Sequence, residues 1–316
     1  MIKKIKISGN KKWLLLGLLS VAVNIQAEVL VILPESGPMA RAGLSIKQGI
    51  LSAYQASQAN IPLKFVNSDQ KTIKTILKKN VSQKTQMIIG PLARADVEAL
   101  IQENPKIPVL ALNEVAMRHK NVWQYSLSKE DDSLALIQRL EKDKIKHIYI
   151  LRQPGTETES LSFLNALHQE YAAQLEPVAL IPKKLEKNQG VLLLGNNKWL
   201  NSIPNLPKQQ LYTAALAIED SQPLPVGIQF CDVPAIYQAQ WNDVIDAYKQ
   251  NPTSMPYQRL LAFGGDAWQI AEQFVLHPQV KNLSFSGRTG KIQILSNRVK
   301  RTPQCFQNTQ RGLKFL

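Results

Sequence analysis

The residues with the greatest potential for chemistry are two serines that each precede a lysine by three positions, an acidic run and four histidines. Ser126 with Lys129, and Ser68 with Lys71, have the SxxK spacing that places a lysine one helical turn from a nucleophilic serine in some enzymes. Neither the SDN nor the KTG motif that accompanies this spacing occurs in the chain. The histidines are far apart and have no cysteine at metal-ligand spacing. We therefore predict a protein that is not an enzyme and that needs no metal or cofactor.

The acidic run Glu130-Asp131-Asp132 is open to two interpretations. Adjacent carboxylates could serve as an acid–base cluster. They also follow Ser128, a good N-cap residue with Asp131 in the capping-box position, and acidic side chains complement the positive end of a helix. Their position favours this second, structural interpretation. Asp266, beside two glycines, is open to the same choice, either as a structural cap or as a residue of a binding cleft.

The elements that must position these residues follow an α/β order. Residues 87–112 form a strand that stops at Gly90-Pro91, a helix with apolar residues at helical spacing, and a second buried strand. Residues 28–33 and 63–66 have the composition of two earlier strands, each followed by a helical pattern. This order predicts a doubly wound parallel sheet, in which ligands bind beyond the carboxyl ends of the strands.

A second series of strands and helices, over residues 147–248, predicts a second α/β lobe. We therefore expect a two-lobe fold, each lobe a mostly parallel sheet flanked by helices. The expected division is a signal peptide over 1–27, lobe 1 over 28–123, lobe 2 over 124–255, a return to lobe 1 over 256–283 and a C-terminal hairpin of lobe 2 over 284–316. The candidates for a cleft between the lobes are Ser36, Gly37, Ser68, Pro91, Leu92, Asn113, Glu114 and Asp266. No arginine is expected at these strand ends to hold a carboxylate.

The first 27 residues have the pattern of a cleaved export signal. Five lysines precede an apolar core over residues 13–23, which is too short to span a bilayer, and Ala27 is the small residue that a signal peptidase requires. We therefore expect export to the periplasm with cleavage of the signal, the alternative being an uncleaved N-terminal anchor. We expect no lipid anchor, because no cysteine follows the apolar core. Cleavage would lower the formal net charge from +14 to +9.

This basic balance indicates acidic partners, such as phospholipid head groups, acidic cell-wall polymer or an acidic patch on a protein. A basic surface that merely aids solubility is an equally good reading. Nucleic acid is not expected as a partner, because the lysines are scattered and are not interleaved with aromatic residues. Two cysteines, Cys231 and Cys305, remain after cleavage. In an oxidising compartment they could form a disulfide, and the alternative is two buried thiols.

Several segments, in order along the chain, resemble the C-terminal domain of LpoA-type penicillin-binding-protein activators. They are residues 33–40 (LPESGPMA), 89–92 (IGPL), 109–113 (VLALN), 126–132 (SLSKEDD), 227–234 (GIQFCDVP), 259–268 (RLLAFGGDAW), 285–290 (FSGRTG) and the basic stretch 298–301. Together they extend over nearly all of the chain beyond the signal. The resemblance implies the fold of type I periplasmic binding proteins, with two α/β lobes joined by three crossings.

The resemblance also implies a non-enzymatic role, namely binding and stimulating a class A, bifunctional penicillin-binding protein that polymerises and cross-links peptidoglycan. Peptidoglycan itself, or an unidentified small ligand in the cleft, is a further candidate partner. The alternative from a different functional class is a periplasmic substrate-binding protein that delivers a small polar solute to an ABC transporter. Because many functions share the type I fold, fold alone does not separate the two.

Overall fold

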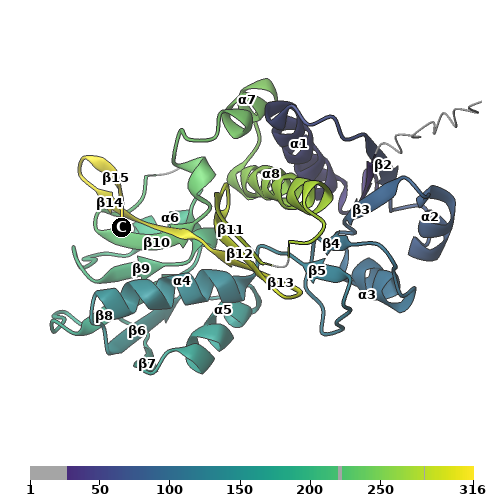
Figure 1. Ribbon diagram of the computed structural model, residues 1–316. Helices are drawn as coiled ribbons and strands as arrows, with labels where there is room; N and C mark the ends of the chain where they lie inside the picture. Colours follow the sequence, from purple (N-terminus) through teal and green to yellow (C-terminus); the bar gives the residue numbers. More distant parts are fainter. Residues whose placement is uncertain (1–26, 220–222, 281) are drawn as a thin grey trace, which may run out of the picture.

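The computed structural model describes residues 27–219, 223–280 and 282–316, so the expected signal peptide lies outside the described residues except for Ala27. Two mixed sheets, each flanked by helices, form the two lobes of the molecule (Figure 1). The predicted two-lobe α/β fold is confirmed. Among the described residues, no helix has the length and apolar character needed to cross a membrane.

The first lobe contains an eight-stranded sheet in the order β11-β12-β13-β5-β4-β3-β1-β2. Strands β1 to β5 and β13 are parallel, whereas β11 and β12 form an antiparallel edge. The strands are β1 (Glu28–Leu33), β2 (Leu63–Asn67), β3 (Thr85–Ile89), β4 (Val109–Ala111), β5 (Val122–Gln124), β11 (Asn282–Gly287), β12 (Gly290–Leu295) and β13 (Arg298–Thr302). The helices of this lobe are α1 (Ala40–Ser57), α2 (Ile73–Asn80), α3 (Arg94–Gln102) and α8 (Met255–Leu276).

Strand β1 shows why this sheet is covered on both faces. Its alternate residues enter two different cores, so that Val29 and Val31 pack on the side of α1 and α8, and Leu30 packs on the side of α2 and α3. A parallel strand buried on both faces has an uninterrupted apolar sequence, as residues 29–33 (VLVIL) do.

Helices α1 and α8 lie against each other because two glycines permit close approach (Figure 1). A Cβ at Gly264 would lie 2.1 Å from the Ile46 carbonyl oxygen, and a Cβ at Gly49 would lie 1.9 Å from the Leu261 carbonyl oxygen. The Gly264-Gly265 pair therefore lies inside one continuous helix and marks a contact between helices.

The second lobe contains a seven-stranded sheet in the order β15-β14-β10-β9-β8-β6-β7. The strands are β6 (His147–Arg152), β7 (Gln174–Pro177), β8 (Gln189–Leu194), β9 (Leu211–Thr213), β10 (Ile228–Asp232), β14 (Gln304–Thr309) and β15 (Gly312–Phe315). Its helices are α4 (Lys129–Lys142), α5 (Glu157–Glu170) and α6 (Asn197–Ser202), and α7 (Asn242–Gln250) packs on α1 of the first lobe. Short 3-10 helices η1 (Ala215–Ala217) and η2 (Pro234–Ile236) follow β9 and β10.

The C-terminal segment corrects one expectation. Residues 284–316 were predicted to be a hairpin of lobe 2, but β11, β12 and β13 belong to the sheet of the first lobe and only β14 and β15 join the second. The physical reason is burial, because Ile292, Ile294 and Val299 complete the apolar core beneath α8. The chain therefore crosses between the lobes for the third time at Pro303, between β13 and β14.

A disulfide joins Cys231 and Cys305. The two cysteines are directly opposed on the antiparallel strands β10 and β14, next to the opposed pair Phe230 and Phe306. The bridge therefore fixes the register of the last strand pair relative to the rest of the second sheet.

Candidate functional site

The main candidate site is a cleft of about 540 Å³ between the two lobes. Residues after β3 and β4 form one wall, and α4 and α5 of the second lobe form the other. From the first lobe it is lined by Leu92, Arg94, Leu112, Asn113 and Glu114, and from the second by Lys129, Glu130, Ser162, Asn165 and Gln169, among others. A second cavity of about 420 Å³ lies at the carboxyl ends of β8 and β9. Lys129 lines both cavities, so they are neighbours.

Asn113 holds the wall of the first lobe together. Its side-chain nitrogen donates to the Leu92 carbonyl at 3.0 Å, and its side-chain oxygen accepts from the Glu114 backbone N–H at 2.9 Å. This amide therefore ties the loop after β3 to the loop after β4. Because two of its bonds are already made to backbone, Asn113 shapes the cleft more than it offers free bonding capacity to a ligand.

Three of the predicted cleft residues, Leu92, Asn113 and Glu114, line this cleft, whereas Ser36, Gly37, Ser68 and Pro91 are not among its lining residues. Ser36 donates to the Asp69 carboxylate at 2.8 Å and accepts from the Asn67 amide at 2.9 Å. The polar groups after β1 and β2 are therefore bonded to one another.

Asp266 corrects a second expectation. It lies inside α8 and is fully buried (0 % exposed), so it neither caps a helix nor lines the cleft. Its carboxylate accepts from the backbone N–H groups of Arg288 and Thr289 at 2.7 and 2.8 Å, and from the Thr289 hydroxyl at 2.6 Å. Asp266 thus anchors the turn between β11 and β12 onto α8. Burial raises the pKa of this carboxyl, and Arg288 opposes that rise.

Two basic residues of the cleft were missed by sequence reasoning. Arg94 lines it, with Nε 3.5 Å from the Asn113 side-chain oxygen, and Lys129 lines it too, with Nζ 3.3 Å from Asp132. The expectation that no arginine lies at these strand ends was therefore wrong. The available signal was the position of both residues in the first turn of a helix that begins shortly after a strand ends.

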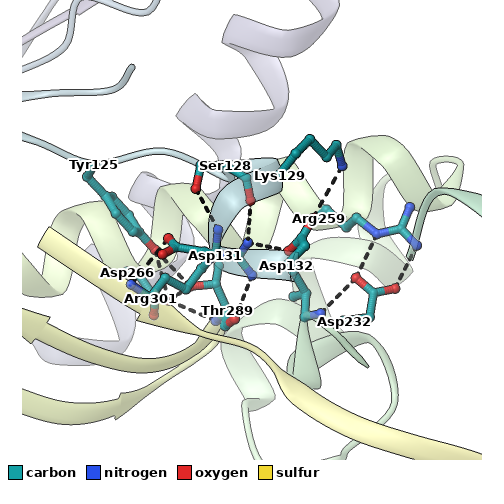
Figure 2. Close-up of polar contacts among 11 residues, drawn as sticks. Tyr125, Ser128, Lys129, Asp131, Asp132, Asp232, Arg259, Asp266, Thr289 and Arg301 are labelled. Carbon is teal, nitrogen blue, oxygen red and sulfur yellow. Dashed lines mark hydrogen bonds and ion pairs between the residues drawn. The ribbon is translucent and has the colours of Figure 1, made fainter. Parts of the chain in front are cut away.

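A buried polar network lies at the crossings between the lobes (Figure 2). Two of its residues, Ser128 and Lys129, also line the cleft. Arg301 of β13 is only 2 % exposed, and it donates to Asp132 of α4 at 2.5 Å and to the Thr289 and Ser128 carbonyls at 3.4 Å. Since β13 belongs to the first lobe and α4 to the second, the pair of Arg301 and Asp132 joins the lobes directly.

A second buried ion pair lies at another crossing. Arg259, near the start of α8, donates through Nε and Nη2 to both carboxylate oxygens of Asp232 at 2.8 and 2.6 Å. Asp232 ends β10 of the second lobe, so this bidentate pair fixes the start of α8 relative to the second sheet. Removing one partner of a buried pair leaves an uncompensated charge, which is why such pairs resist rearrangement.

The acidic run is part of this network. Ser128 accepts from the Asp131 backbone N–H at 3.0 Å, so the predicted N-cap is confirmed. Burial raises the pKa of the Asp131 carboxyl to about 6; Arg301 opposes the rise, and Glu114 across the cleft adds to it. Tyr125, buried in the core of the first lobe, contacts Thr289 at 2.8 Å and Asp266 at 3.3 Å, and burial raises its pKa well above the ordinary value.

The site offers charge and hydrogen bonding to a polar ligand. Two cations, Arg94 and Lys129, and two carboxylates, Glu114 and Glu130, line the same cleft, so its lining is nearly balanced in charge. Within residues 27–219, 223–280 and 282–316, no group of three or more His, Cys, Asp or Glu side chains is arranged to hold a metal ion.

Comparisons with known proteins agree with the resemblance noted in the sequence. The model of the family described as "LppC putative lipoprotein" matches residues 13–186. The penicillin-binding protein activator LpoA of Haemophilus ducreyi is 25% identical over 317 residues, which cover 91% of this chain and 52% of that protein. The chain thus spans about half the length of this relative. For this chain, the expected lack of a lipid anchor remains a prediction, because the segment concerned lies outside the described residues.

Solved structures show the same fold. The C-domain of LpoA from Haemophilus influenzae, described as a regulator of PBP1A, superposes with a TM-score of 0.73 at 19% identity and covers 92% of this chain and 100% of that domain. A protein from Chromobacterium violaceum, described as "a putative branched-chain amino acid ABC transporter", has a TM-score of 0.73 at 20% identity, covering 88% of this chain and 99% of that one. The family model extends over more than half of the sequence, and the chain belongs to the LppC family.

Proposed function

We propose that this protein is a non-enzymatic periplasmic regulator that binds and activates a class A penicillin-binding protein. The observation that carries this proposal is the match to LpoA, which extends over 91% of the chain in sequence, together with the full coverage of the LpoA C-domain in structure. The relatives matched are named as activators of penicillin-binding proteins. Export through the segment of residues 1–27 would deliver the chain to the compartment in which such a partner works.

The ion pairs at the crossings between the lobes favour a scaffold role over a transport role. A solute receptor captures its ligand by closing two lobes, and closing must rearrange the contacts at the crossings. Here two buried ion pairs, Arg301 with Asp132 and Arg259 with Asp232, join the lobes at those crossings. Each would have to shift or break during a large rotation. A fixed relation of the lobes suits a protein that presents a constant surface to a partner.

The alternative, a periplasmic substrate-binding protein, is favoured by one observation. Arg94 and Lys129 line the inter-lobe cleft, and a charged solute needs such groups. The Chromobacterium violaceum protein has the same fold at 20% identity. A likeness at that identity supports the fold of this alternative and not its function.

The test of the proposed function is direct binding. The purified native protein is immobilised and exposed to detergent-solubilised class A penicillin-binding protein at low and high salt. We expect retention with micromolar or tighter affinity that weakens as salt rises, because the chain is basic and attraction between exposed charges is screened. An unrelated periplasmic protein of similar positive charge is the control. Equal retention on the control, or none on this protein, would refute the proposal.

A further inference from the structure

A cavity of about 750 Å³ lies at the amino-terminal edge of the first sheet. Its lining includes Gln86 near the start of β3, Pro108 directly before β4 and Lys120 shortly before β5. The inter-lobe cleft lies beyond the opposite, carboxyl ends of these strands, because its walls include Leu92 after β3 and Asn113 after β4. The cavity and the cleft are therefore separated by the length of the strands.

Two aromatic rings form part of the apolar lining of this cavity. Trp123 of β5 and Phe274 of α8 both line it, and their ring centroids lie 4.7 Å apart. Phe274 is buried, whereas Trp123 is only partly buried. The indole N–H donates to the Ser296 carbonyl at 2.7 Å. Because this N–H is already bonded, the exposed part of the indole offers a ligand an apolar surface and not a hydrogen bond.

The turn between β12 and β13 forms a fixed wall of the cavity. Besides the bond from the indole to Ser296, the Asn297 side-chain nitrogen donates to the His119 carbonyl at 3.2 Å and to the Lys120 carbonyl. These bonds tie the turn to the segment that leads into β5. A wall held in this way needs little further ordering when a ligand binds.

Several polar groups of the lining retain bonding capacity. Gln86 is exposed, and its side-chain amide has no hydrogen-bond partner among the described residues. Within the same part of the chain, the Ser296 hydroxyl is also unpaired and the Asn297 side-chain oxygen accepts no hydrogen bond. A carboxamide or a hydroxyl can serve a ligand as donor or acceptor. Lys120 is the one charged residue among the described residues of the lining.

This combination of groups selects the chemistry of the ligand. A cationic ligand would meet no carboxylate among the described lining residues, and a multiply charged anion would meet one lysine. An entirely apolar ligand would cover polar groups without bonding them, which costs free energy. A sugar ring has an apolar C–H face that fits the indole and hydroxyl groups that donate and accept. An acetamido substituent on the ring adds an amide for the polar groups and a methyl group for the apolar lining.

We propose that this cavity binds a saccharide chain that carries acetamido groups. One sugar ring stacks on the exposed part of Trp123. Its hydroxyl and acetamido groups bond to the Gln86 amide, the Ser296 hydroxyl and the Asn297 side-chain oxygen. The inference goes beyond the proposed function, because it assigns a ligand of this protein's own to a site that synthase binding does not require.

The test compares two saccharides by isothermal titration calorimetry on the native protein. Tetra-N-acetylchitotetraose is the probe, and cellotetraose is its match, because it has the same β-1,4-linked chain without acetamido groups. We expect the acetylated saccharide to bind roughly tenfold more tightly, since the acetamido group adds a hydrogen bond and a buried methyl group.

Variants of the lining locate the binding. Gln86→Leu should keep the fold, because the native side chain is exposed, and should weaken binding of the acetylated saccharide by roughly threefold to tenfold. Trp123→Leu should weaken it by roughly tenfold or more, and its melting temperature shows whether it folds. The matched control Gln102→Leu replaces an exposed glutamine of the same lobe outside the lining of this cavity, and it should leave binding unchanged.

Three outcomes would overturn the inference. They are no binding of the acetylated saccharide, equal affinity for the two saccharides, and equal affinity of the native protein and Gln86→Leu for the acetylated one. Tighter binding of the uncharged peptide acetyl-Ala-Gln-Ala amide than of the saccharide would also overturn it, by assigning the cavity to a peptide. If saccharide binding fails while the synthase is still retained, the proposed function stands and this inference falls. Saccharide binding without synthase retention would have the reverse meaning.

Discussion

Asp131 illustrates how a single buried residue makes the stability of the fold depend on pH. Burial raises its pKa from 3.8 to about 6, so between these values the folded protein holds a proton that the unfolded chain releases. The stabilising contribution of this proton is fully present below about pH 4 and is lost as the pH rises through 6. At neutral pH the folded protein therefore carries an ionised Asp131 at a cost.

Replacing Asp131 with Asn should remove this cost. We expect Asp131→Asn to raise the free energy of unfolding by about 2–3 kcal/mol at pH 8, and to have little effect at pH 4, where the native carboxyl is protonated in the fold. Urea denaturation of both proteins at the two pH values measures the difference. The same change in stability at pH 4 and pH 8 would contradict this interpretation of Asp131.

Among the residues at the crossings between the lobes, Arg301 is the one whose loss should lower the free energy of unfolding most. Removing it leaves Asp132 buried without its main partner, so we expect Arg301→Met to lower the free energy of unfolding by about 3–5 kcal/mol. Adding Asp132→Leu should recover a large part of this loss, because the orphaned charge is then gone. Thermal and denaturant unfolding provide the measurement. A double variant that is less stable than Arg301→Met would show that the pair acts through packing and not through charge.

At the scale of elements, the strands of the first lobe could be predicted from local pattern, because apolar runs ended by breakers determine them. The N-cap at Ser128 could be predicted for the same reason. The C-terminal hairpin could be predicted too, but its place in the first sheet could not, since β13 is placed by pairing with β5 and by an arginine bonded 169 positions away in sequence. In the cleft, Leu92 and Asn113 follow strand ends and could be predicted. Arg94 was missed because its place depends on where α3 begins.

The contact between α1 and α8 is the element-level feature most open to a test. Because a Cβ at Gly264 would collide with backbone of α1, we expect Gly264→Ala to lower the free energy of unfolding by about 1–3 kcal/mol, despite the better helix propensity of alanine. Glu272→Ala, on the same helix, removes atoms and should change stability by about 0.5 kcal/mol or less. Denaturant unfolding compares the two. A Gly264→Ala variant as stable as the native protein would mean that the helices are not closely packed there.

For the whole molecule, the two proposed functions make different demands on the cleft. We expect free amino acids to leave the melting temperature unchanged, because the Asn113 amide is already bonded to backbone and the charges of the lining nearly balance. A ligand at 100 times its dissociation constant would stabilise the fold by about 2.7 kcal/mol, a shift that thermal-shift screening detects readily. A clear shift with any amino acid would favour the transport function.

The most direct test of the central claim measures synthase activity. The rate of glycan-strand polymerisation and cross-linking by a purified class A penicillin-binding protein is recorded with and without this protein, over a range of concentrations and at low salt. We predict a saturable increase in rate that falls as salt is raised, while the protein alone produces no reaction. Unchanged synthase rates at saturating concentrations of the folded protein would contradict the account.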